Sequence, residues 1–189
     1  MKPMQKLKVA LIAVALGLFT MAKPAHAVNP QSLDITVSIL ATKSLSVNTT
    51  FYDFGGLVVN QSSVSATAII VTNNSGALIS TYTLQGANAN STEGGTNWTL
   101  AASTGTDIYA LAAQFSTARP VDLNANWLAD DLTSSAITAS ATVLGNGTVG
   151  ESGSNVFPSA TRNLWFRMKT PGVVSDTTQR KATLTLAVL

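Results

Sequence analysis

The sequence contains no cysteine, and its single histidine, His26, lies near the N-terminus. Without thiols the chain forms no disulfide bond, carries no lipid-anchored cysteine and offers no thiolate to zinc. His26 also falls within a segment that we expect to be removed on export. The processed chain then lacks the base required for Ser-His-Asp or Cys-His catalysis.

Charged residues are scarce, at 11% of the chain. The full chain carries 11 Lys and Arg and 9 Asp and Glu, a net charge of +2. Four of the basic residues precede residue 28, so the remaining 162 residues carry 7 basic and 9 acidic side chains, a net charge of −2. The basic residues do not cluster on one element. We therefore expect no nucleic-acid partner.

Long apolar runs are absent except near the N-terminus. Lys2, Lys6 and Lys8 precede an apolar run of 14 residues, Val9 to Ala22, and Ala25-His26-Ala27 follows. This run is shorter than the ~20 residues that span a bilayer, and small residues at the end suit a signal peptidase. The pattern predicts a cleaved signal peptide over residues 1–27 and a single domain over residues 28–189. We expect a bacterial protein that is secreted, extracellular or at the cell surface, with the periplasm as an alternative, and no transmembrane segment after cleavage.

What is abundant is serine and threonine. Residues 28–189 include 19 Ser and 24 Thr. Threonine and valine suit a pleated, half-buried surface, whereas serine, threonine and asparagine compete poorly inside helices. No segment shows an apolar stripe with the helical period. The composition favours β-structure.

Apolar and polar residues alternate with period two in several short runs. The runs extend from Leu33 to Ile39, Leu45 to Val47, Val64 to Ile70, Leu78 to Leu84 and Trp98 to Leu100, over residues 107–115, 136–144 and 163–168, and from Leu184 to Val188. Asn, Gly, Ser and Pro clusters separate the runs. About nine such strands with turns between them predict an all-β, antiparallel two-sheet sandwich of the immunoglobulin-like kind. Residues 116–135 are less regular and are expected to hold a short helix or a lid-like loop.

A cluster of oxygen-bearing side chains follows this break. Asp122, Asn124, Asn126 and Asp130 have the spacing of the first ligands in a calcium loop, where alternate oxygens surround a hard cation. Trp127 stands where that loop requires glycine, and Thr133 stands where it requires a bidentate glutamate. The pattern therefore leaves two alternatives, a calcium site or an ordinary polar loop with Asx turns. No other cofactor is expected.

Aromatic residues make up 6% of the chain. Trp98 and Trp165 lie in alternating runs and are expected in the core, because large rings dominate core burial. Trp127 lies in a polar loop and is a candidate for stacking on a sugar ring, with Tyr109 or Tyr82 as neighbours. Surface glycans are therefore one class of expected partner.

Carboxylates are the remaining acid–base groups of the processed chain near neutral pH. A glycosidase needs two that face each other about 5–10 Å apart. Asp107, Asp122, Asp130, Asp131 and Glu151 are available, but none lies in a recognisable motif. We therefore expect no enzymatic activity and no catalytic residues.

Several stretches carry a resemblance to known proteins. They are "YDFGGLVV", "VTNNSG", "TYTLQ", "NWTL", "GTDIYALAAQF" and "LWFRMKTP", followed by a terminal Thr/Leu run. In this order they resemble small, exported, cysteine-free β-sandwich proteins of bacteria that mostly lack assigned functions. Trp98-Thr99-Leu100, with Phe54-Gly55 upstream, is also similar to the WxL cell-wall-binding domains. Here the final run has no Trp, unlike in those domains.

These observations predict a non-catalytic structural or interaction protein of the cell surface, a filament or an adhesion layer. Unpaired strand edges and low charge favour self-association by strand addition. The run Leu33 to Leu40 and the C-terminal run are the expected donors. The alternative is a carbohydrate- or cell-wall-binding module.

Overall fold

The computed structural model describes residues 36–37 and 42–189. All its secondary-structure elements belong to residues 40–189, which form one compact unit. They comprise nine strands and one short 3-10 helix, and no α-helix occurs in the described part of the chain. The predicted all-β class is therefore confirmed. The predicted signal peptide, residues 1–27, lies outside the described residues.

The strands range from two residues in β5 and β7 to ten residues in β4. They are β1 (Leu45–Val47), β2 (Ser62–Val64), β3 (Ile69–Asn73), β4 (Tyr82–Ser91), β5 (Thr99–Leu100), β6 (Ile108–Phe115), β7 (Ile137–Thr138), β8 (Thr161–Lys169) and β9 (Arg180–Val188). The 3-10 helix η1 spans Asn124–Asn126. This helix confirms the short helical turn expected within residues 116–135.

The larger sheet has the order β1-β3-β8-β6-β5, and β2 also pairs with β8. All its pairs are antiparallel except β5 with β6, which is parallel. β2 and β3 lie on the same side of β8, because β6 occupies the other edge of β8 opposite both of them. β2 pairs with the C-terminal end of β8 and β3 with its N-terminal end. The run that we predicted from Val64 to Ile70 is thus two strands rather than one.

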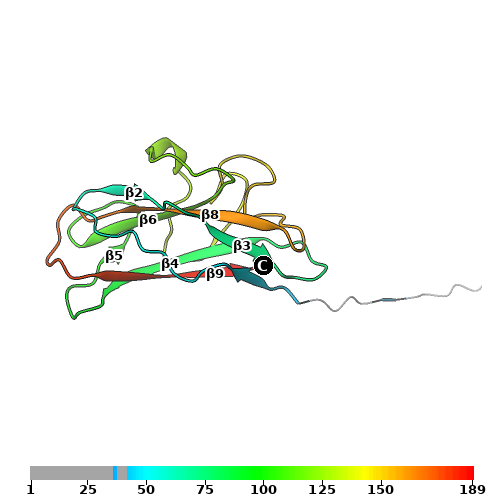
Figure 1. The fold of residues 1–189 in the computed structure, drawn as a ribbon, viewed down its shortest axis with the longest axis horizontal. Coiled ribbons are helices and arrows are strands. Elements are labelled where there is room, and N and C mark those ends of the chain that lie inside the picture. The colour runs from blue at the N-terminus through cyan, green and yellow to red at the C-terminus, as the bar shows by residue number, and fades with distance from the viewer. Residues whose placement is uncertain (1–35, 38–41) are drawn as a thin grey trace, which may run out of the picture. The chain divides into compact units, whose positions relative to one another are not determined.

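The smaller sheet has the order β7-β4-β9. β9 pairs antiparallel with β4, from Val188 opposite Tyr82 to Arg180 opposite Ser91, with a bulge between Gly86 and Ala89. The two sheets lie face to face as the layers of a sandwich-like body (Figure 1).

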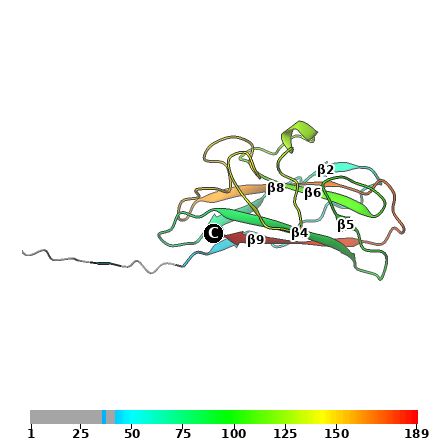
Figure 2. The ribbon, with the colours of Figure 1, turned by 180° about the vertical axis from the view of Figure 1, so that it is seen from behind.

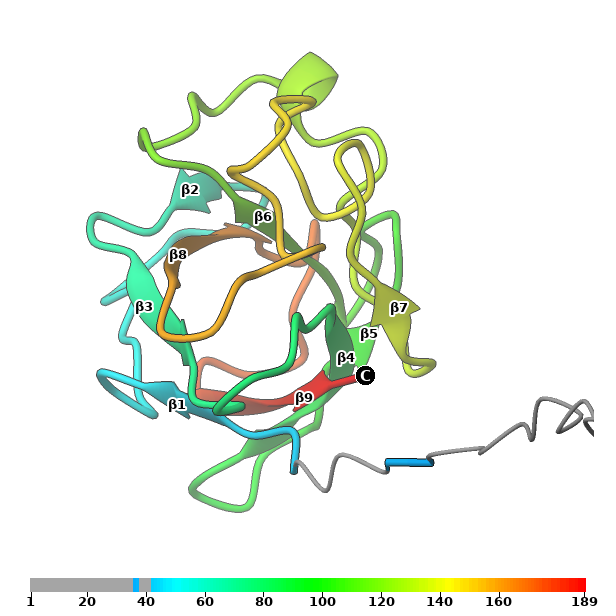
Figure 3. The ribbon, with the colours of Figure 1, turned by 90° about the vertical axis from the view of Figure 1, so that its right-hand side faces the viewer.

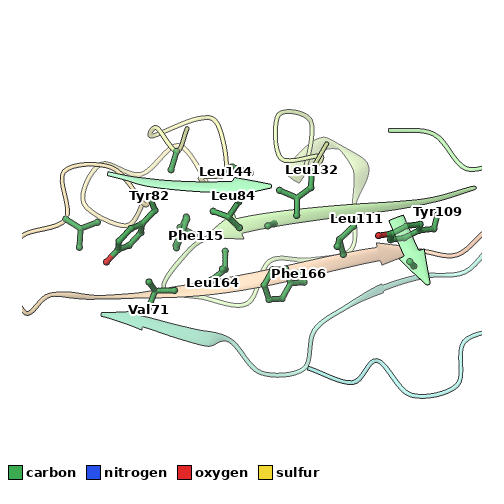
Figure 4. Packing of buried hydrophobic residues seen from close by; sticks show 14 residues of the cluster. Val71, Tyr82, Leu84, Tyr109, Leu111, Phe115, Leu132, Leu144, Leu164 and Phe166 are labelled. Carbon is green, nitrogen blue, oxygen red and sulfur yellow. The ribbon is translucent and has the colours of Figure 1, made fainter. Parts of the chain in front are cut away.

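The main core fills the space between the layers. Figure 4 shows its largest side chains, which come from both sheets and, at Leu132 and Leu144, from loops. They are Val71, Tyr82, Leu84, Tyr109, Leu111, Phe115, Leu132, Leu144, Leu164 and Phe166. Burial raises the pKa of both Tyr82 and Tyr109 to about 12, because a phenolate would lose its hydration there.

The larger sheet is also covered on its outer side. η1 and parts of the loops between β6 and β8 lie over the outer face of this sheet (Figures 1 and 2). Val64, Ala112, Trp127 and Trp165 form a second, smaller apolar cluster beneath them. Consequently seven of the eight residues of β6 are buried, and the strand is buried on both faces.

The sequence pattern overestimated one strand and underestimated another. From residue 136 to residue 144, only Ile137 and Thr138 form a strand, because the chain then bends. In this bend the N–H groups of Thr142 and Val143 donate to Ser140 Oγ. β4 continues through residues 86–91, Gly-Ala-Asn-Ala-Asn-Ser, where pairing with β9 outweighs the absence of large apolar side chains.

In the described residues, no helix is both long and apolar enough to cross a membrane.

Candidate functional site

Two of the predicted calcium ligands face cations. Asp122 Oδ1 accepts hydrogen bonds from Arg167 Nε at 2.6 Å and from Ser62 Oγ at 2.8 Å. Asn124 Oδ1 accepts from Arg167 Nη2 at 2.8 Å and from Lys169 Nζ at 2.9 Å. These oxygens already bind two positive side chains of β8, which would repel a calcium ion.

The other two predicted ligands serve different contacts. Asn126 is exposed, and its backbone carbonyl accepts from Gln114 Nε2 at 2.7 Å. Asp130 is 2% exposed; its Oδ2 accepts from Gln114 Nε2 at 2.7 Å and its Oδ1 from the Gly145 N–H at 3.2 Å. The four side chains therefore bind different groups of the protein in this structure, and calcium binding by this loop stays a prediction. The loop is held by cations and amides of the protein itself.

No alternative metal site takes its place. Across residues 36–37 and 42–189, no group of three or more His, Cys, Asp or Glu side chains is arranged to hold a metal ion.

Hydrogen bonds to Asp130 instead connect three segments of the chain. It joins β6, through Gln114, to the loop of residues 116–135 and to Gly145. A hollow of about 570 Å³ opens beside it, lined also by Ser116, Arg119 and Asn146. Because both carboxyl oxygens of Asp130 already accept hydrogen bonds, and Arg119 donates to the carbonyls of Val64 and Ser65, the hollow presents no facing acid–base pair from these groups.

The buried carboxyl makes stability depend on pH. Burial raises the pKa of Asp130 to about 6, above its ordinary value of 3.8, despite the hydrogen bonds from Gln114 and Gly145. Between these two values the unfolded state ionises first, so the folded state loses stability as the pH rises.

Replacing Asp130 with Asn removes this titration. We expect the unfolding free energy of wild type relative to Asp130→Asn to fall by about 2–3 kcal/mol between pH 4 and pH 7. Urea unfolding of both proteins across this range measures the difference. Parallel pH profiles for the two proteins would contradict the assignment.

The predicted sugar-stacking residue is also buried. Trp127 is 2% exposed, its ring packs in the smaller apolar cluster, and its Nε1 donates to the Val121 carbonyl at 3.0 Å. Tyr82 and Tyr109 lie in the main core. None of the three offers a ring face to a ligand, so the stacking prediction at Trp127 is wrong in this structure. The polar loop that suggested exposure folds its one large ring onto the outer face of the sheet.

The other tryptophans contribute to packing. Trp165 is buried and donates from Nε1 to the Ser116 carbonyl at 2.9 Å, as expected for a core residue. Trp98 is half-buried against the main core, and the Arg180 guanidinium lies 5.2 Å from the centre of its ring. Arg180 Nη2 also donates to Asp176 Oδ1 at 2.6 Å, which lowers the pKa of that carboxyl together with bonds from Thr178 and Thr96. These contacts fix the start of β9.

One edge of β9 has backbone groups without a hydrogen-bond partner among the described residues. The Leu189 N–H donates to the Thr81 carbonyl at 2.8 Å, and the Ala89 N–H and carbonyl both pair with Trp98 rather than with Ala182. Since antiparallel ladders alternate hydrogen-bonded and non-hydrogen-bonded pairs, these bonds establish which residues of β9 face β4. Ala182, Leu184, Leu186 and Val188 direct their N–H and carbonyl groups away from it.

No hydrogen bond joins those outward groups to another described residue. We call the backbone groups of Ala182, Leu184, Leu186 and Val188 the β9 edge. Their side chains pack against the main core but are only half-buried, whereas the same kinds of side chain on β6 are buried. The β9 edge therefore lacks both a hydrogen-bonding partner and complete apolar cover.

A second segment of this chain with few backbone hydrogen bonds runs along the same side of the body. Figures 1 and 3 show residues 48–61, in cyan, passing along the side on which β9 ends its sheet. Residues 51–54 alternate between exposed and half-buried, and Phe54 packs against the core with its ring 4.9 Å from that of Tyr52. No backbone–backbone hydrogen bond involves residues 51–57. This segment has the alternation of a strand without a strand partner.

The C-terminal run therefore has a structural role that differs from the one we predicted. We predicted it as a donor strand, but it is β9, already paired with β4 along one side. The sequence contained its alternation, but could not show which of its two edges is free.

Comparison of the chain with protein-family models, with curated proteins and with solved structures found no match.

Proposed function

We propose that this protein is an exported, non-catalytic structural or interaction subunit of the bacterial cell surface, with an immunoglobulin-like sandwich body that associates through the β9 edge. The observation that supports the proposal is the row of unpaired backbone groups on a nine-residue strand at the end of the smaller sheet. An exposed strand edge is a template for another strand, and natural proteins shield such edges unless they use them.

The chemistry of the surface agrees with this proposal. The outward side chains Lys181, Thr183, Thr185 and Ala187 of β9 are exposed, and they include one charge. Edge strands that avoid association commonly carry several charges, a proline or an inward-pointing charge. β9 has neither a proline nor an inward charge beyond Arg180, which is paired with Asp176.

The carbohydrate-binding alternative loses the residue on which it was based. Every Trp and Tyr side chain is buried or half-buried, including Trp127. A glycan array and pull-down on cell-wall polysaccharides would still detect sugar binding by other residues.

Sedimentation of the processed chain from Val28 tests the proposal. We expect concentration-dependent self-association that Ala182→Pro weakens at least tenfold, because proline removes an N–H of the β9 edge and no bond to β4. The matched control is Thr138→Pro on the opposite edge of the same sheet. The Ala139 N–H bonds to Tyr82, so the Thr138 N–H points away from β4.

Thr138→Pro should leave self-association unchanged, and circular dichroism should show that both variants fold. A processed chain that stays monomeric at high concentration would overturn the proposal. So would association that depends on Thr138 but not on Ala182.

A further inference from the structure

The N-terminal run has the composition of the strand that the β9 edge lacks. Leu33, Ile35, Val37 and Ile39 alternate with Asp34, Thr36 and Ser38. Val37, in the middle of this apolar row, is 86% exposed, and Thr36 is exposed beside it. An apolar row of this kind gains stability only when another surface covers it.

We infer that residues 33–40 of a second copy of this chain add as a strand to the β9 edge; this inference rests on the proposed function and names its partner. The added strand would place its apolar row over the half-buried Leu184, Leu186 and Val188 and complete the cover of the core. Its polar row would join the exposed Thr183 and Thr185 on the outer face.

The lengths and charges of the two strands match. In a parallel register that sets Asp34 beside Lys181, Thr36 lies beside Thr183 and Ser38 beside Thr185. The same register sets Ile35, Val37 and Ile39 beside Ala182, Leu184 and Leu186. Residues 34–39 of the run then each have a like or complementary neighbour on β9.

The connection to β1 favours a second copy over the chain's own β9. Thr42, Lys43 and Ser44 contain no turn and are exposed, and the Ser44 carbonyl accepts from the Asn74 N–H at 3.0 Å, which continues the pairing of β1 with β3. Residues 41–44 contain no Gly, Pro, Asn or Asp, the residues that reverse a chain tightly. The sequence therefore supplies no tight reversal between the run and β1, which favours addition to a second copy.

Paired substitutions in the run test the donor. In the processed chain, Ile35→Asp with Val37→Asp places two charges in the apolar row and should weaken self-association at least 100-fold. Thr36→Asp with Ser38→Asp adds the same charge to the polar row and should weaken it less than tenfold. Sedimentation velocity measures both, and equal effects of the two pairs would overturn the inference.

Cross-linking tests the acceptor, because the chain has no cysteine of its own. A Thr36→Cys chain is mixed with chains bearing Thr183→Cys, Thr185→Cys or Ala187→Cys, and with a Thr99→Cys control on β5. Disulfide-linked heterodimers should form with at least one β9 variant and not with the control, and the position that reacts gives the register.

The outcomes separate the two proposals. Self-association without any β9 cross-link overturns the donor inference and leaves the proposed function standing, whereas a strictly monomeric chain overturns both. A Thr36→Cys, Thr183→Cys double variant that forms its disulfide only within a monomer, at every concentration, overturns the second-copy inference because the run then binds its own chain.

Discussion

Replacing Asn73 with alanine should lower the free energy of unfolding by about 3–4 kcal/mol, a large effect for a polar side chain. Asn73 is fully buried at the end of β3. Its Nδ2 donates to the Leu78 carbonyl at 3.0 Å and to the Val156 carbonyl at 2.8 Å. Its Oδ1 accepts from the Ser75 N–H at 2.9 Å and from Ser80 Oγ at 3.2 Å.

The loss of stability comes from those partners of Asn73 that would be left without a hydrogen bond. The Val156 carbonyl also accepts from the Ser80 N–H, and Ser80 Oγ also bonds Ser75 Oγ. The Ser75 N–H and the Leu78 carbonyl have no such second bond, and a buried polar group without a partner costs about 1–3 kcal/mol.

Chemical denaturation of the variant measures the loss. The matched control is Asn74→Ala, next along the chain, where the side chain is exposed. It should change stability by less than about 0.5 kcal/mol. Similar losses in the two variants would show that the turn itself, rather than the buried amide, determines the effect.

Replacing Phe115 with alanine should cost about 3–5 kcal/mol, as expected for deletion of a fully buried ring. Phe115 ends β6, is 0% exposed and lies with its ring centre 5.7 Å from that of Tyr82. Gly153 passes so close that an added Cβ there would stand 2.5 Å from the ring. The ring therefore fills its site completely, and its removal leaves a cavity between the two sheets.

Phe157→Ala is the control, since that ring is 61% exposed. Its loss should be less than about 0.5 kcal/mol by the same denaturation measurement. If Phe115→Ala proved as mild as Phe157→Ala, the main core would not depend on the contact between β6 and the loop at Gly153.

These two residues show what governs the proposed assembly. Asn73 and Phe115 hold the loops and the central strand from within, so the body remains folded while the β9 edge stays unpaired. The Asp122–Arg167 ion pair, at 2.6 Å, and the Asp130 bonds fix the outer loops in the same way. Residues that resemble a metal site in the sequence thus connect segments of the body to one another.

Much of the fold was predictable from local information. Alternation along residues 182–188 correctly marked β9, because a strand with one face toward a core repeats every two residues. The nearly continuous apolar run of residues 108–115 marked β6, which is buried on both faces. The turn at Asn73 to Gly76 was equally predictable from its residue types. The burial of Asn73 was not, because its partner at Val156 is 83 positions away.

The sequence by itself determined the strand-forming composition, the absence of cysteine and of any histidine other than His26, and the apolar row from Leu33 to Ile39. These properties depend on residue type and on near neighbours. Only the tertiary structure decided that Trp127 is buried, that Asp122 and Asn124 face Arg167 rather than a metal, and that one edge of β9 is unpaired. Each of these depends on which distant segments meet, and period-two alternation is the same for a strand with one neighbour as for a strand with two.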